Sequence, residues 1–325
     1  MKKIAVLTRD CAGVNAAIRS VVRAATFRGL EVVGVMRGYD GLMDNHLIPL
    51  DQQAVSGIIG RGGTILKTAR ARRFTTIEGQ KKALETIKKN RLDGMIVIGG
   101  NGSLAGAHVL AGTYGFPVVG IPATIDNDVN GVDMTIGTDT AINVALDSID
   151  KIRDTVTSLE RIYVVEVMGR ECGYLALHVA IAGGCEEVMI PEQKSDIKAM
   201  CDEITAGEAK GKGSWIVIVA EGIAKAHEVA KDITGRTGLE TRSVVLGHVQ
   251  RGGSPTAFDR TLAAYLGDYA VETLLAGKSD CCVGRKDSTL ITIPLTEAIK
   301  GKTFDVEGAY RLIKILSQRE QTLTV

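Results

Sequence analysis

Short apolar runs alternate with amphipathic stretches along most of this chain. The apolar runs are rich in valine and isoleucine and lie at residues 3–8, 31–36, 94–99, 117–122, 161–168, 187–191, 215–222 and 243–249. Between them, residues 14–25, 79–90 and 137–154 place apolar side chains at the i, i+3, i+4, i+7 spacing of a helix. Strands that are apolar along their whole length and separated by helices are typical of parallel sheets buried on both faces. The pattern therefore predicts an α/β fold.

The predicted strands fall into two groups on either side of the long helix at 137–154. A chain of 325 residues is also long for a single core. We therefore predict two Rossmann-like lobes with mainly parallel, doubly wound sheets. The first lobe would comprise residues 1–137 plus about 250–300, and the second residues 138–249 plus about 301–325.

Composition narrows the class of protein. Hydrophobic residues make up 45%, charged residues 24%, and the net charge is +1, so no overall field favours nucleic acid or an anionic membrane. No apolar run approaches the roughly 18 residues of a membrane span. The first apolar run ends at Arg9, too early for a signal peptide, and the six cysteines lack metal-binding spacing. We expect a cytoplasmic protein that binds neither nucleic acid nor membrane.

A glycine-rich turn, GGNGS at residues 99–103, follows the apolar run at 94–99 and precedes a helical stretch. Glycines let the backbone approach a phosphate, and a helix N-terminus offers N–H donors with a partial positive charge. An ordinary strand-to-helix turn gives the same pattern, and Gly100-x-Gly102-x-x-Ala105 also matches a dinucleotide site. The turn therefore indicates phosphate binding only in combination with other residues.

Charged side chains gather at further strand ends. Thr124, Asp126 and Asp128 follow the run at 117–122, and Glu221 follows another run. Guanidinium groups bind phosphate with two parallel hydrogen bonds, and four arginines lie at strand ends: Arg161, Arg170, Arg242 and Arg251. In open parallel sheets, ligands bind beyond the carboxyl ends of the strands. Phosphate turn, carboxylates and arginines together predict phosphoryl transfer onto a phosphorylated polyol.

Four longer motifs carry a family resemblance over essentially the whole chain. They are PATIDND (122–128), VEVMGRECG (165–173), AGGCEE (182–187) and LGHVQRGGSPTAFDR (246–260). In this order and spacing they resemble the 6-phosphofructokinase family. The resemblance implies transfer of a phosphoryl group from ATP to the 1-hydroxyl of fructose 6-phosphate, with Mg²⁺ as cofactor.

The resemblance implies that the first lobe binds the nucleotide and that the second binds the sugar phosphate and an effector. It also implies roles for individual residues. Asp126 would accept the proton of the sugar hydroxyl, with Thr124, Arg70 and Arg170 as the other catalytic residues. The substrate-binding set would be Thr124, Ile125, Asp126, Arg161, Met168, Gly169, Arg170, Glu221, Arg242, His248, Val249, Gln250 and Arg251. The nucleotide set would be Tyr39, Arg70, Ala71, Gly100, Asn101, Gly102, Ser103 and Gly106, with Asn101 and Asp128 at the metal.

Assembly and regulation are implied as well. In related enzymes the arginines that match Arg161 and Arg242 reach across a subunit interface, which implies a homotetramer. Arg19 and Arg23 are spaced i, i+4 and share one helix face. They belong to the set that matches the family's site for a nucleotide or phosphoenolpyruvate-type effector: Arg19, Arg23, Arg153, Gly184, Glu186, Lys210 and Lys212. A solvated basic helix face would give the same spacing.

Three departures from the family pattern lie on the nucleotide side. Residues 8–15 read TRDCAGVN, two residues shorter than the usual TSGGDxxGxN and without its paired glycines. Asn101 replaces a metal-site aspartate, and Ala71 replaces a common phenylalanine. These changes leave open a weakly active or non-catalytic relative that serves as a binding or regulatory subunit.

The phosphoryl donor has an alternative too. Members of the family that use pyrophosphate typically carry aspartate at the position of Gly102 and lysine at that of Ala123. Neither is present, which favours ATP over pyrophosphate. A dinucleotide-using enzyme is a further alternative, but it needs an acidic residue at the end of the next strand, where this chain has Ile121-Pro122.

Overall fold

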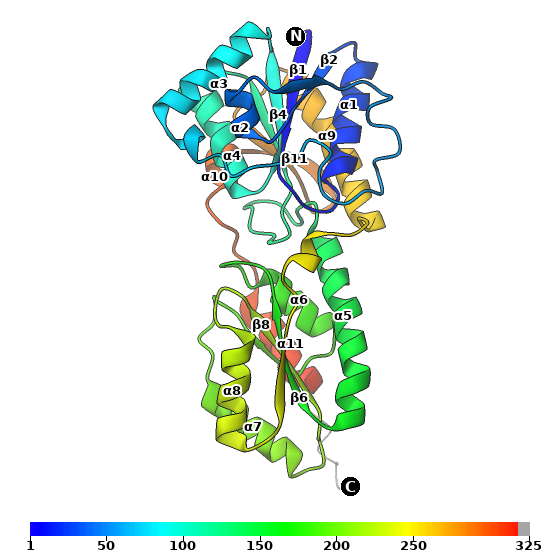
Figure 1. Ribbon diagram of the computed structural model, residues 1–325, viewed down its shortest axis with the longest axis vertical. Coiled ribbons are helices and arrows are strands. Elements are labelled where there is room, and N and C mark those ends of the chain that lie inside the picture. Colours follow the sequence, from blue (N-terminus) through cyan, green and yellow to red (C-terminus); the bar gives the residue numbers. More distant parts are fainter. Residues whose placement is uncertain (318–325) are drawn as a thin grey trace. The chain divides into compact units, whose positions relative to one another are not determined.

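The computed structural model describes residues 1–317, and the last eight residues of the predicted second lobe, 318–325, lie outside this range. The chain divides into two compact units (Figure 1). Unit 1 comprises Met1–Thr140 and Arg251–Lys302, and unit 2 comprises Ala141–Gln250 and the segment from Thr303 onward. Each unit has its own sheet, and the predicted α/β fold with mainly parallel strands is confirmed.

Unit 1 is built on a seven-stranded sheet in the order β11-β10-β5-β4-β1-β2-β3. The strands are β1 (Lys3–Thr8), β2 (Glu31–Val35), β3 (Leu47–Pro49), β4 (Gly94–Gly99), β5 (Val118–Pro122), β10 (Cys281–Lys286) and β11 (Thr289–Pro294). β3 and β11 pair antiparallel at the two edges, and the other pairs are parallel. The central strands are buried because helices cover both faces.

Two groups of helices cover this sheet (Figure 1). On one face α1 (Val14–Phe27) packs against α9 (Ala257–Leu275). On the other face one apolar core joins the sheet to the remaining helices, which are α2 (Tyr39–Met43), α3 (Ile77–Lys89), α4 (Asn101–His108) and α10 (Leu295–Ala298). A 3₁₀ turn, Arg72–Thr75, precedes α3, and a π-helical turn, Val109–Thr113, follows α4. The core thus fixes the carboxyl ends of the strands.

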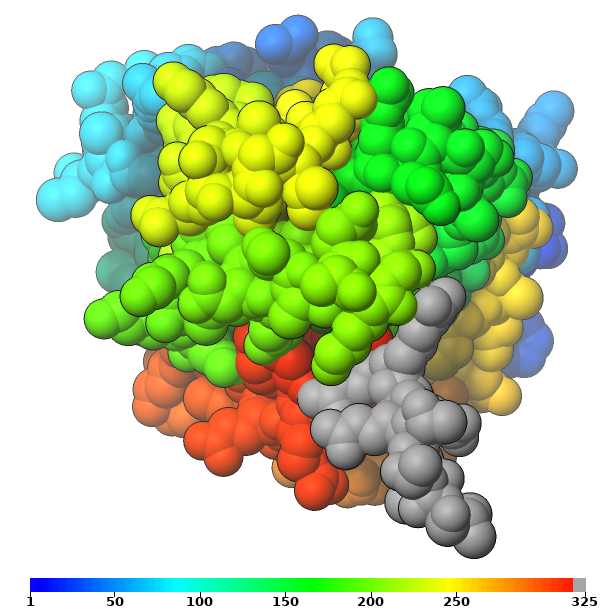
Figure 2. All heavy atoms as spheres, turned by 90° about the horizontal axis from the view of Figure 1, so that it is seen from below, coloured from blue at the N-terminus to red at the C-terminus, as the bar shows by residue number. Residues whose placement is uncertain are grey.

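Unit 2 contains a parallel four-stranded sheet in the order β7-β8-β6-β9. The strands are β6 (Ile162–Val167), β7 (Glu187–Met189), β8 (Trp215–Ala220) and β9 (Thr241–Val245). An apolar core packs one face against α7 (Ile197–Glu208) and α8 (Ala226–Thr237). The other helices are α5 (Thr138–Leu159), α6 (Tyr174–Ala182) and α11 (Val306–Ser317). In the space-filling view the red α11 lies beside the yellow-green segment of α7, where Lys314 donates to Glu203 at 2.8 Å (Figure 2).

Some strands differ from the sequence-based predictions. The apolar run at 243–249 was predicted as a strand, but β9 ends at Val245 and Gly247–Arg251 form a 3₁₀ turn. Gly247 has a φ of 55°, so the chain leaves the extended conformation at that point. Strands β3, β10 and β11 were not predicted. The β10–β11 hairpin turns at Asp287-Ser288, whose φ angles of 47° and 65° suit a two-residue turn without the usual glycine.

Among residues 1–317, no helix is both long enough and apolar enough to cross a membrane.

Candidate active site

The carboxyl ends of β1 and β4 mark the topological switch point of unit 1. The chain continues from β1 to β2 on one side and from β4 to β5 on the other, so a ligand crevice is expected between the two strand ends. The turn after β4 leads directly into α4, whose N-cap, Gly100, provides no side-chain hydrogen bond to the first helical N–H groups. A Cβ on Gly100 would lie 3.1 Å from Cβ of Thr124. The glycine therefore lets the turn lie close to the loop after β5.

The loop after β5 is held by a network of hydroxyl and amide groups. The hydroxyls of Thr135 and Thr138 donate to the carbonyl oxygen of Thr124 at 2.6 and 3.0 Å. The backbone N–H of Asp126 donates to Oγ1 of Thr124 at 3.2 Å, and Asp126 is only 3% exposed. This network fixes the backbone of the predicted catalytic loop at Asp126.

Asn127 is a site residue that the sequence reasoning missed. It is fully buried with a φ of 50°, its Oδ1 accepts from Thr135 N at 2.9 Å, and its Nδ2 donates to Asp133 O at 3.1 Å. A left-handed residue with an amide that bonds nearby backbone shapes the loop that presents Asp126 and Asp128. Its position between two aspartates in the motif was the available signal.

Asn101 and Asp128 lie together, as the predicted metal pair requires. Nδ2 of Asn101 donates to Oδ2 and to the backbone oxygen of Asp128, at 2.9 and 3.2 Å. Oδ1 of Asn101 is buried and accepts no hydrogen bond from residues 1–317. An amide oxygen without a donor beside a carboxylate suits Mg²⁺, which takes few protein ligands. No cluster of three His, Cys, Asp or Glu side chains within the described chain offers an alternative metal site.

Tyr39 packs against α4, the helix that follows the glycine turn. Its hydroxyl donates to Ser103 O at 2.8 Å, and its ring stacks on Phe74 with centroids 4.2 Å apart. A Cβ on Gly106 would lie 2.7 Å from that ring, so glycine is required there for close packing. The side chain is 7% exposed, and burial raises the pKa of its hydroxyl. Tyr39 thus fixes α4, while Arg70 and Gly102 are exposed and Ala71 is half-buried.

In unit 2, the end of β6 forms a tight turn. Gly169 and Arg170 have φ angles of 140° and 53°, and the buried Gln250 accepts a hydrogen bond from Met168 N at 2.8 Å. Oε1 of Glu221 accepts from Arg170 N at 3.2 Å. These bonds join three predicted substrate loops at the carboxyl edge of the sheet. His248 and Val249, in the adjoining 3₁₀ turn, are exposed, and Arg251 is half-buried in unit 1.

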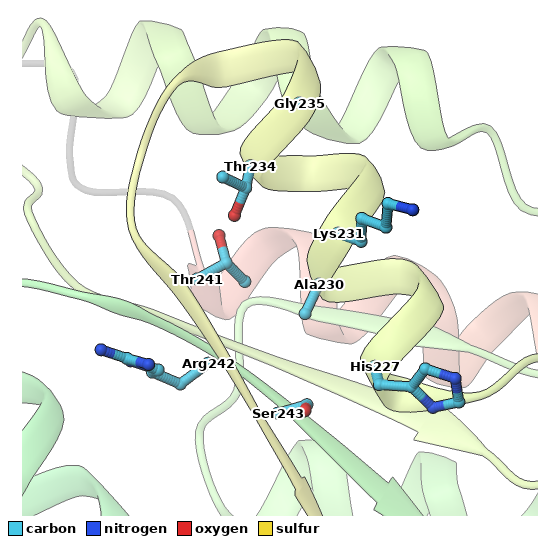
Figure 3. Close-up of a pocket in the computed structure, with 8 residues that line it drawn as sticks. All are labelled: His227, Ala230, Lys231, Thr234, Gly235, Thr241, Arg242 and Ser243. Carbon is cyan, nitrogen blue, oxygen red and sulfur yellow. The ribbon is translucent and has the colours of Figure 1, made fainter.

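The predicted arginines divide into two groups. Arg161 precedes β6 and Arg242 is the second residue of β9. Both therefore lie at the amino ends of these parallel strands, whereas Arg170 lies beyond the carboxyl end of β6. Glu240 joins them, because it pairs with Nε of Arg161 at 2.9 Å and with Nη2 of Arg242. Figure 3 shows Arg242 on β9 beside a hollow of about 560 Å³ between that strand and α8. The strand-end argument from sequence therefore holds only for Arg170 and Arg251.

Residues of the predicted effector set lie in both units. In unit 1, Arg19 and Arg23 line a hollow of about 380 Å³ on α1, and neither guanidinium pairs with an acidic side chain of residues 1–317. In unit 2, Arg153 donates to the backbone oxygens of Gly183 and Gly184. Lys212 pairs with Glu186 at 3.4 Å and lies over the Trp215 ring, and Lys210, two residues earlier, is exposed.

Asp259 is a second residue that the sequence reasoning left without a role, although it lies in a quoted motif. Its carboxylate is fully buried on α9 and accepts hydrogen bonds from Gly137 N, Thr140 N and Thr140 Oγ1, at 2.9, 2.9 and 2.5 Å. Burial is the main cause that raises its pKa. Asp259 thus fixes the start of α5, directly after the catalytic loop.

Comparison with known proteins agrees with this geometry. The phosphofructokinase family model matches residues 3–274. The chain is 49% identical over 319 residues to the ATP-dependent 6-phosphofructokinase of Halalkalibacterium halodurans and 48% identical over 319 residues to that of Thermotoga neapolitana, with 98% of this chain and 100% of each relative covered. The structure matches phosphofructokinase from Saccharomyces cerevisiae with a TM-score of 0.85 and 35% identity, covering 92% of this chain and 45% of that chain. The chain therefore belongs to the phosphofructokinase family.

Proposed function

We propose that this protein is an ATP-dependent 6-phosphofructokinase, which transfers the terminal phosphoryl group of ATP to the 1-hydroxyl of fructose 6-phosphate. The observation that carries the proposal is the buried Asp126, fixed by Thr124 beside the glycine turn at the switch point of unit 1. The names of the two bacterial relatives support the same donor and acceptor.

Asp126 acts as the general base. As the sugar oxygen forms its bond to phosphorus and the bond to the leaving ADP oxygen breaks, the hydroxyl proton passes to the Asp126 carboxylate. Arg70 and Arg170 provide positive charge for the transferring group, since the transition state spreads negative charge over its equatorial oxygens. The N-terminus of α4, with Asn101, Gly102 and Ser103, offers N–H groups to the donor phosphates.

Asn101 and Asp128 would hold Mg²⁺ through Oδ1 and a carboxylate oxygen. A bound magnesium ion supplies positive charge that neutralises the donor phosphates. The hydrogen bond from Nδ2 of Asn101 to Oδ2 of Asp128 at 2.9 Å keeps the two side chains next to each other.

Fructose 6-phosphate is bound by the loops at the carboxyl edge of the unit 2 sheet. Met168, Gly169 and Arg170 form one loop, and Glu221 and His248 provide groups from the neighbouring loops. Backbone N–H groups and a guanidinium suit the phosphate, and a carboxylate suits the sugar hydroxyls.

Arg161 and Arg242 would complete the site of a second copy of this chain. The six residues of β6 lie between Arg161 and Met168, so seven steps of extended strand, ~23 Å, separate the two residues, which is farther than an arginine side chain extends. One chain therefore cannot bring Arg161 to the loop that contains its own Arg170. Donation across an interface supports a homo-oligomer, and the resemblance specifies a homotetramer.

The same chain would bind a nucleotide or phosphoenolpyruvate-type effector. Arg19 and Arg23 leave two guanidinium groups available for a phosphate on one face of α1. Arg153, Gly184, Glu186, Lys210 and Lys212 form the unit 2 part of the proposed set.

An assay that compares donors tests the proposal. With fructose 6-phosphate and Mg²⁺, ATP should support formation of the bisphosphate and pyrophosphate should not. Gly102 and Ala123 support this preference, because neither carries the charged side chain that pyrophosphate-using members of the family typically have at these positions. Turnover with pyrophosphate alone would identify the other donor, and binding without turnover would identify a non-catalytic subunit.

A further inference from the structure

Arg9 lies at the switch point of unit 1, in the shortened first loop. Its backbone N–H donates to Ile98 O at 2.9 Å and so continues the pairing of β1 with β4 by one residue. Its side chain passes close to the glycine turn, because a Cβ on Gly99 would lie 3.1 Å from Cγ of Arg9. Its Nη1 then donates to Oγ1 of Thr68 at 3.1 Å and to Ala69 O at 2.7 Å.

These two bonds are the last of a series that fastens the segment 61–69 to the first loop. At the start of the segment, Asn15 donates to the carbonyl oxygens of residues 61 and 62 and accepts from Ile65 N at 2.8 Å. In the middle, the Thr8 and Thr64 hydroxyls bond at 2.8 Å. At the end of the segment, the Arg9 side chain bonds Thr68 and Ala69.

Arg70 follows directly after this last attachment. It is exposed, and its guanidinium forms no hydrogen bond or ion pair with any residue between 1 and 317. A long, unrestrained side chain loses rotamer entropy when it is ordered on a ligand, so its placement depends on the backbone from which it extends. The bond from Arg9 to the carbonyl oxygen of Ala69 fixes the peptide group that leads into Arg70.

We propose that Arg9 is a positioning residue that holds the backbone of Arg70 in register with the phosphate site. The inference rests on the role proposed above for Arg70. Both N–H groups of Nη1 are engaged by oxygens of the 68–69 backbone and side chain, so Arg9 works as a staple between β1 and this loop. The planar guanidinium fixes the directions of the two Nη1 N–H groups, whereas a lysine ammonium carries rotatable donors on a flexible stem.

A double-mutant cycle tests the inference. We expect Arg9→Ala to lower kcat by roughly 10–100-fold, because a displacement of about 1 Å at a catalytic group costs this much, and to leave KM for fructose 6-phosphate within about twofold. In the background of Arg70→Ala, the same change should lower kcat by less than about threefold, since the group being positioned is already missing. Arg9→Lys should resemble Arg9→Ala, because charge alone does not replace the staple.

The other outcomes are distinguishable. Multiplicative losses in the double variant, or wild-type kcat in Arg9→Ala or Arg9→Lys, overturn the positioning role. Wild-type kcat in Arg70→Ala shows instead that the proposed role of Arg70 is wrong. If Arg9→Ala fails to fold, Thr68→Val replaces it in the test, because it removes one acceptor and keeps Arg9. A loss of a few-fold in kcat that disappears in the Arg70→Ala background supports the positioning role. A loss in kcat that persists in that background overturns it. Arg73→Ala is the matched control and should keep wild-type kcat. Arg73 lies three residues after Arg70, in the 3₁₀ turn, and pairs with Asp44 at 2.7 Å.

Discussion

At the scale of single residues, the proposed mechanism depends on the carboxylate of Asp126. Asparagine has nearly the same shape but cannot accept a proton. Asp126→Asn should therefore lower kcat by roughly 10²–10⁴-fold, the usual effect of removing a positioned base, while fructose 6-phosphate binding is retained. Steady-state kinetics with a binding measurement checks this, and an unchanged kcat would remove Asp126 from the mechanism. Thr138→Val, which removes one of the two hydroxyls bonded to Thr124 O, is a milder companion and should lower kcat much less.

Asn101 gives the second prediction at this scale. Aspartate at this position would place a second carboxylate against Oδ2 of Asp128, where Nδ2 now donates at 2.9 Å. Two like charges at this distance repel each other in the absence of a cation and bind a divalent cation more strongly. Asn101→Asp should therefore lower the Mg²⁺ concentration needed for half-maximal activity and reduce thermal stability without Mg²⁺. An unchanged magnesium titration would show that Asn101 does not hold the metal.

Some spatial relations among the site residues could be predicted from the sequence, and others could not. Asp126, Asn101 and Asp128 could be predicted as close neighbours because each follows a parallel strand, and such ends meet at one edge of the sheet. Asn127 and Asp259 could not, because their roles depend on buried backbone N–H groups that no sequence pattern identifies.

At the scale of secondary-structure elements, Asp259 connects α9 to the start of α5. Asp259→Ala would leave Gly137 N and Thr140 N buried without their acceptor. Each such buried group costs about 1–3 kcal/mol, so the free energy of unfolding should fall by about 2–5 kcal/mol. Denaturant unfolding measures this. Asp268→Asn, on the same helix but in an exposed pair with Arg28 at 2.8 Å, is the control and should cost less than about 1 kcal/mol.

The pH dependence of the same carboxylate gives a further prediction. Its pKa is raised above the ordinary value of 3.8, chiefly by burial. A group whose pKa is higher in the folded state contributes stability that is fully present below the unfolded pKa and is lost as pH rises through the folded pKa. The free energy of unfolding of wild type minus that of Asp259→Asn should therefore be largest in acid and decrease as pH rises above about 4. A difference that grows with pH would mean that the three hydrogen bonds outweigh burial.

The strands that could be predicted are those with a continuous apolar run in the sequence. The central parallel strands are apolar along their whole length because both faces are covered, so β1, β4 and β8 were evident. The edge strands β3 and β11 have partly exposed patterns, so neither has the continuous burial of the central strands. The end of β9 was misplaced because Val249 continues the apolar run, although it is 61% exposed in a 3₁₀ turn.

At the scale of the whole molecule, the opposite locations of Arg161 and Arg170 in the unit 2 sheet lead to a complementation experiment. Arg161→Ala and Asp126→Asn chains should each be nearly inactive alone. If Arg161 acts in the site of another copy, mixed oligomers regain some sites with both an intact Asp126 and a partner's intact arginine. Refolding the two variants together should therefore restore a sizeable fraction of wild-type activity. Activity that stays at the sum of the two variants would place both residues in the site of one chain.

The central claim is that this chain transfers a phosphoryl group from ATP to the 1-hydroxyl of fructose 6-phosphate. The most direct measurement incubates the purified protein with Mg²⁺, fructose 6-phosphate and ATP labelled in its terminal phosphate, and then locates the label in the product. We expect the label on the oxygen of carbon 1 of fructose 1,6-bisphosphate, with many turnovers per site. Label that remains in ATP, or is released only as inorganic phosphate, would contradict the central claim.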